Sequence, residues 1–136
     1  MIAVTTPQKG NNMGYESKLY VVEKSSMIGA CGKRWAEVIA VFDICKCYAV
    51  SDVLRGKPQT DCYIFADDGD TEITEDMYGE PLTESEIADV IKIIEEAQTH
   101  EGCKNYRRLP YVLAALKSFE EHKDQWRDVV VLHYGH

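Results

Sequence analysis

Residues 126–134, with the sequence WRDVVVLHY, decide the fold that this chain can adopt. Four apolar side chains, Val129, Val130, Val131 and Leu132, follow one another there without a polar break. Successive side chains of a strand point to opposite faces, so this strand would be apolar on both faces. Such strands lie in the interior of a sheet that is covered on both sides. We therefore expect Trp126–Tyr134 to be an interior strand.

Three further strands are expected upstream of this one. Ser17–Lys24 alternates between two faces, and Trp35–Tyr48 is rich in strand-forming residues and is the longest candidate. These two should pair antiparallel across a loop at 25–33, because consecutive strands usually lie side by side. Thr60–Ala66 forms the third strand, and the Asp and Gly residues at 67–70 suit a turn after it.

Two helices are expected between the third and the last strand. The run Thr83-Glu84-Ser85-Glu86 matches a capping box, and an apolar stripe follows it to about His100. A second helix should begin near Pro110 and end near His122. Ser51 could also cap a short helical turn over Asp52–Arg55.

The expected fold is therefore α+β, with one mostly antiparallel sheet of about four strands packed against two helices. The element order is β-β-β-α-α-β, with the short helical turn before the third strand. Residues 1–12 are polar and lack periodicity, so we expect a flexible N-terminal arm. Residues 13–136 should form a single domain, since a chain of 136 residues is long enough for one buried core.

Composition narrows the classes of partner and the compartment. A net charge of −8 disfavours direct binding to nucleic acid and to anionic membranes, and no apolar run is long enough for a membrane helix. The five cysteines are an odd number, and the N-terminal residues do not resemble a secretory signal. Free thiols in a reducing interior are typical of such a chain, so we expect it in the cytoplasm.

Negative charge is concentrated in one segment. Residues 58–91, called the acidic segment here, hold eleven carboxylates and no lysine or arginine, so the remainder of the chain is mildly basic. The eleven are Asp61, Asp67, Asp68, Asp70, Glu72, Glu75, Asp76, Glu80, Glu84, Glu86 and Asp89.

Three interpretations of the acidic segment are open. Carboxylates at 67–72 could bind Mg²⁺ or Ca²⁺, although their spacing is not that of an EF-hand loop. They could instead be a solvated loop and helix N-terminus. They could also imitate the phosphates of a nucleic acid and dock on a basic protein surface, which we favour because capping explains only two of them. The predicted partner-binding residues are Asp67, Asp68, Asp70, Glu72, Glu75, Asp76 and Glu80.

Cysteine and histidine residues suggest a second class of function. Cys45 and Cys47 are two positions apart, and His100 precedes Cys103 by three, so the four could form a zinc site. Neither pair has the usual knuckle spacing, and free cysteines are common in cores, so no metal or cofactor is predicted. Cys31, between two glycines, is the candidate for an exposed reactive thiol. A zinc- or thiol-dependent enzyme is thus the alternative function.

Four segments resemble small proteins of phages and prophages: residues 15–20 (YESKLY), 75–82 (EDMYGEPL), 106–108 (YRR) and 131–135 (VLHYG). The resemblance implies a mobile-element protein in the cytoplasm of a bacterial host. Such elements encode small acidic inhibitors of host defence nucleoproteins, among them anti-CRISPR proteins. By this resemblance the partner is a basic host protein such as a CRISPR effector, and the chain is a non-enzymatic inhibitor. A phage housekeeping protein with a merely solvating acidic face is the remaining alternative.

Overall fold

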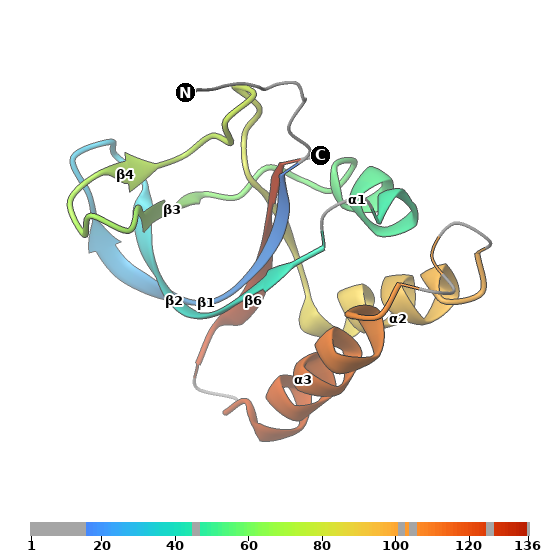
Figure 1. Cartoon of the computed structure of the whole chain (residues 1–136). Coiled ribbons are helices and arrows are strands. Elements are labelled where there is room, and N and C mark those ends of the chain that lie inside the picture. Colours follow the sequence, from blue (N-terminus) through green and yellow to red (C-terminus); the bar gives the residue numbers. More distant parts are fainter. Residues whose placement is uncertain (1–15, 45–46, 101–102, 104–105, 125–126, 136) are drawn as a thin grey trace.

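Strand β6, Val129–Gly135, lies in the interior of a curled sheet in the computed structural model of the chain (Figure 1). The structure describes residues 16–44, 47–100, 103, 106–124 and 127–135. The predicted arm, residues 1–12, lies outside them. The fold is α+β, as expected, with the helices grouped together on one side of the sheet.

The sheet has six strands in the order β4-β3-β2-β1-β6-β5, where about four were predicted. Five of its strands precede β6 in the chain: β1 (Ser17–Ile28), β2 (Arg34–Asp43), β3 (Cys62–Phe65), β4 (Glu72–Ile73) and β5 (Thr83–Ser85). β1 pairs antiparallel with β2, as expected for these consecutive strands. It also pairs antiparallel with β6, which therefore has a neighbour on each side, as expected for an interior strand. The β2–β3 pair is parallel, so the sheet is mixed, although its other four pairs are antiparallel.

The apolar run of β6 is buried on both faces, which explains its central position. Val129 and Val131 contribute to a core between the sheet and the helices. Val130 and Leu132 belong to a second core on the opposite face, together with Ile64 of β3. Because alternate side chains enter different cores, no polar residue can be placed in the run without loss of buried apolar area.

Three helices cover one face of the sheet, and two match the predicted segments. α2 is Ile87–Ala97 and α3 is Leu109–His122, with a proline in its first turn. Ile87, Val90 and Ile94 of α2 are fully buried, as the apolar stripe predicted. α2 ends at Ala97, three residues before the predicted end. None of the helices in the described part of the chain has the length and apolar character needed to cross a bilayer.

The second predicted strand and the first short helix differ from the structure. β2 ends at Asp43, and α1, Tyr48–Leu54, occupies the place where that strand was expected to end. α1 therefore begins four residues before the predicted turn, and Ser51 is buried within it instead of capping it. β1 extends to Ile28, so it is longer than β2, and the loop after it is shorter than predicted. The pairing of β1 with β2 ends at Asp43, so this long-range contact, and not the strand propensity of the residues up to Tyr48, sets the end of β2.

The predicted capping box is wrong. Thr83 to Ser85 form strand β5, which pairs antiparallel with β6. The Thr83 hydroxyl donates to the carbonyl of Leu54 at 2.8 Å, and Glu84 lies against Lys24. Glu86 precedes the helix without a side-chain capping bond. Pairing with β6 satisfies more backbone N–H and C=O groups than a capping box would, so these residues form a strand and not the first turn of a helix.

Candidate functional site

The turn between β3 and β4 is built by the carboxylate of Asp68. Its Oδ1 accepts the backbone N–H groups of Asp70 at 2.8 Å and Thr71 at 2.9 Å, and its Oδ2 accepts the Thr71 hydroxyl at 2.6 Å. These donors, the hydroxyl first, hold the pKa of Asp68 at about 2. Gly69, with φ of +77°, completes the turn. The turn predicted at 67–70 is therefore present, and Asp68 is charged at neutral pH.

Glu72 of β4 fixes the loop between β1 and β2. Its Oε1 accepts the backbone N–H of Cys31 at 2.8 Å, and its Oε2 accepts that of Ala30 at 3.0 Å. The contacts with Cys31, from its side chain and backbone, and then with Ala30 lower the pKa of Glu72. The carboxylate keeps its charge and is held at a defined position.

Asp76 organises a second turn. Its Oδ1 accepts the N–H groups of Tyr78 at 2.8 Å and Glu80 at 2.9 Å, and its side chain is buried. The Asp76 N–H donates to the carbonyl of Glu80 at 2.8 Å, which closes the turn. Gly79 adopts a positive φ of 83° there. The residues around Asp76 thus form an ordered turn with a carboxylate at its centre.

The four other predicted binding residues, Asp67, Asp70, Glu75 and Glu80, are exposed. Within the described part of the chain, no lysine or arginine forms an ion pair with these four or with the three carboxylates that build the turns. The set of seven is called the acidic face below. Its negative charge is therefore not cancelled by ion pairs within the described structure.

The two turns influence one pair of tyrosines. Tyr20 of β1 and Tyr134 of β6 meet edge to face, with ring centroids 6.2 Å apart, beside the core opposite the helices. Burial and then the charges of Glu16 and Asp67 raise the pKa of Tyr20, against the effect of Lys18. Burial and several nearby charges, including that of Asp76, raise the pKa of Tyr134. One carboxylate of each turn, Asp67 and Asp76, therefore acts on a pair of tyrosines that contact each other.

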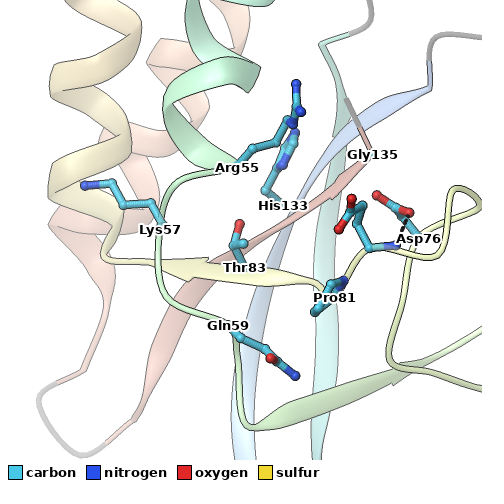
Figure 2. Close-up of a pocket in the computed structure, with 9 residues that line it drawn as sticks. Arg55, Lys57, Gln59, Asp76, Pro81, Thr83, His133 and Gly135 are labelled. Carbon is cyan, nitrogen blue, oxygen red and sulfur yellow. Dashed lines mark hydrogen bonds between the residues drawn. The ribbon is translucent and has the colours of Figure 1, made fainter.

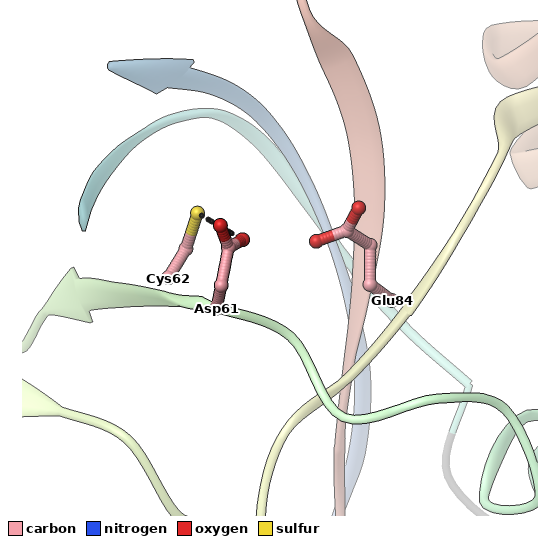
Figure 3. Close-up of side chains that lie close together, drawn as sticks. All are labelled: Asp61, Cys62 and Glu84. Atoms are coloured by element: carbon pink, nitrogen blue, oxygen red, sulfur yellow. Dashed lines mark hydrogen bonds between the residues drawn. The ribbon is translucent and has the colours of Figure 1, made fainter. Parts of the chain in front are cut away.

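Two other carboxylates of the acidic segment are ion-paired. The ammonium of Lys24 lies 3.0 Å from Glu84 and 3.2 Å from Asp61, and the guanidinium of Arg34 lies 3.1 Å from Asp61. With Cys62, these two carboxylates form the only group of potential metal ligands found among the described residues (Figure 3). Because Lys24 already supplies a cation to both carboxylates, the group is explained as an ion-pair cluster.

The zinc site considered from sequence is not assembled by the described residues. The structure does bring Cys47 and Cys103 together, with their sulfur atoms 2.9 Å apart in the core. His100 is exposed, however, and Cys45 lies outside the described residues. Cys47 directly precedes α1 and is not part of a strand, although the predicted strand Trp35–Tyr48 included it. Cys31 is exposed, as expected.

A pocket of about 350 Å³ was not predicted from the sequence (Figure 2). It lies between the end of α1, the turn at Asp76, β5 and β6. Its lining residues are Arg55, Lys57, Gln59, Asp76, Glu80, Pro81, Thr83, His133 and Gly135. No sequence pattern could have revealed it, because its walls come from four separate segments.

Most polar groups of this pocket are already used by the fold. The Arg55 guanidinium pairs with Asp52 at 3.3 Å, and Asp76 and Thr83 make the backbone contacts described above. The ring Nε2 of His133 lies 2.9 Å from the Ser17 hydroxyl, but Ser17 is only 1% exposed. A substrate could not reach this hydroxyl without opening the sheet, so the pair is a structural contact.

The acidic face is thus the candidate site that the geometry supports. Comparison with protein-family models, with curated proteins and with solved structures gives no match to this chain.

Proposed function

We propose that the chain is a non-enzymatic binding protein that docks its acidic face on a basic, nucleic-acid-binding surface of another protein. The observation that carries the proposal is a contrast within the acidic segment. Asp61 and Glu84 form ion pairs with Lys24 and Arg34, whereas the seven residues of the acidic face have no such partner in the described structure. Carboxylates left without counter-charge attract the lysines and arginines that otherwise contact phosphates.

Preorganisation supports the same function. Asp68 and Glu72 are held by backbone N–H groups, so their charges need not be ordered when a partner binds. The buried Asp76 holds the second turn in the same way through the N–H groups of Tyr78 and Glu80. Binding that avoids this loss of side-chain entropy is stronger for the same contacts. The exposed Asp67, Asp70, Glu75 and Glu80 can then adapt to the arginines and lysines of the partner.

The partner class follows from the resemblance to phage and prophage proteins and from the charge. A basic groove that binds guide RNA or target DNA is the surface that an acidic face would block, so an anti-CRISPR-like inhibitor in a bacterial cytoplasm is the most specific form of the proposal. Blocking needs no reaction, cofactor or metal. It also predicts that nucleic acid and this protein compete for one surface.

The test compares two triple variants of equal charge. Asp67→Asn/Asp70→Asn/Glu75→Gln removes three exposed charges of the acidic face and leaves Asp68, which holds the turn, unchanged. Glu37→Gln/Glu96→Gln/Glu121→Gln removes three exposed charges from β2, α2 and α3. Partners captured from a bacterial lysate at low salt are identified by mass spectrometry, purified, and titrated with each protein and with competing nucleic acid.

We expect the first variant to bind at least about tenfold more weakly, with a smaller salt dependence, because fewer counterions are released. The second variant should bind like the unmodified protein. Equal weakening by both variants would reduce the effect to net charge and contradict a local docking face. A partner that still binds its nucleic acid fully in the complex would contradict the inhibitory function.

A further inference from the structure

Cys47 and Cys103 form a buried thiol pair that the proposed function does not use. Cys47 immediately precedes α1 and Cys103 follows α2, 56 positions later in the chain. One thiol donates to the other across 2.9 Å, and the two residues are 1% and 3% exposed. Val50 and Leu109 belong to the same core. The two sulfur atoms therefore meet inside the core to which α1, α2 and the sheet all contribute.

The described structure offers this pair no third ligand. The search for groups of three metal-binding side chains within those residues returns the cluster around Asp61, and neither Cys47 nor Cys103 belongs to it. A structural zinc ion requires four ligands. The two thiols are therefore better placed to react with each other than to hold a metal.

We propose that Cys47 and Cys103 are a modification site at which a low-molecular-weight disulfide, such as glutathione disulfide, introduces a reversible disulfide bond. One protein thiolate attacks glutathione disulfide, which forms a mixed disulfide and releases one glutathione thiolate. The second protein thiolate then attacks the protein sulfur of that mixed disulfide and releases the second glutathione. The protein loses two electrons and two protons, and glutathione disulfide is reduced to two thiols.

Burial makes this reaction slow and dependent on pH. Burial first, and then the hydrogen bond between Cys47 and Cys103, raises the pKa of Cys47 to about 12. The thiolate is the attacking species, so little of Cys47 is reactive at neutral pH. Oxidation should therefore require local opening of the core and should become faster as the pH rises. Once closed, the bond ties the start of α1 to the segment after α2.

The test is disulfide mapping of the full chain. The reduced protein is incubated with glutathione disulfide at pH 7 and pH 9, denatured in acid, alkylated and digested without reduction. We expect a peptide that joins Cys47 to Cys103, formed faster at pH 9 and removed by dithiothreitol. Cys62 is buried and serves as an internal control, which should be recovered alkylated.

Variants and metal analysis complete the test. Cys47→Ala and Cys103→Ala should each abolish the linked peptide, whereas Cys31→Ala, at an exposed thiol, should leave it unchanged. The proposal is overturned if Cys47 and Cys103 are both recovered alkylated, if either is linked to Cys45, or if the purified protein holds stoichiometric zinc. If an alanine variant fails to fold, the disulfide map of the unmodified protein still shows whether Cys47 and Cys103 become linked.

Discussion

Lys24 of β1 reaches past β6 to Glu84 of β5, where its ammonium lies 3.0 Å from a carboxylate oxygen. The lysine side chain is only 10% exposed, and it also contacts Asp61 at 3.2 Å. Burial lowers the pKa of Lys24, but the bonds and charges of Glu84 and Asp61 outweigh burial and raise it. Lys24 therefore joins an edge of the sheet to its interior and forms ion pairs with two members of the acidic segment.

Replacement of Lys24 by methionine should destabilise the protein by about 2 kcal/mol, because Glu84 then loses its cation in a partly buried place and Asp61 keeps only Arg34. Lys18→Met is the matched control on the same strand. Lys18 pairs with Glu16 at 2.9 Å, but both side chains are about one third exposed. Such a surface pair contributes less than about 1 kcal/mol. Urea unfolding of both variants checks the difference, and equal losses would contradict the role given to Lys24.

Gly135→Ala should be more harmful than Gly69→Ala. Both glycines have positive φ, but a Cβ at Gly135 would collide with the backbone carbonyl of Glu16 at the β1–β6 pairing, whereas a Cβ at Gly69 meets open space. We expect about 1 kcal/mol of backbone strain at Gly69 and roughly 3 kcal/mol or more at Gly135, where strands must also separate. Thermal unfolding of the two variants measures this ranking, and a reversed order would show that β1 and β6 approach differently.

Asp68→Asn should lower the melting temperature at pH 7, and the loss should disappear in acid. The native pKa of about 2 lies below the value near 4 of an unfolded aspartate, so ionised Asp68 stabilises the fold above about pH 4. That contribution is lost as the pH falls through about 2. Melting curves from pH 7 to pH 2 should therefore converge for the variant and the unmodified protein. Asp67→Asn is the control, and a pH-independent difference for Asp68→Asn would contradict the assignment.

Ile94→Ala should destabilise the protein by about 2 to 5 kcal/mol, because it removes a fully buried side chain between α2 and the sheet. Lys92→Ala, two residues earlier on the exposed side of the same helix, should change stability by less than about 0.5 kcal/mol. Chemical denaturation of the pair measures how far α2 depends on its apolar stripe. Similar values for the two variants would indicate that α2 contributes little to the core.

Several parts of the fold were predictable because their signals are local. The apolar run at Val129–Leu132 identified an interior strand, since alternate side chains must be covered on both faces. Pro110 and the apolar spacing that follows it located α3 closely. The alternation in β1 and the short connection to β2 predicted their antiparallel pairing. The turn after β3 followed from Asp and Gly residues that favour turns in any context.

Other features required contacts between distant residues. The local capping signal at Thr83–Glu86 failed because pairing with β6 satisfies those backbone groups in a strand. The eleven carboxylates look alike in the sequence, and only the structure separates Asp61 and Glu84, paired with Lys24, from the acidic face. The contact of Cys47 with Cys103 spans 56 positions. Periodicity and turn chemistry thus determined β1, β6, α2 and α3, whereas tertiary contacts decided the short strand β5 and which charges and thiols meet. Those energies depend on residues far apart in the chain.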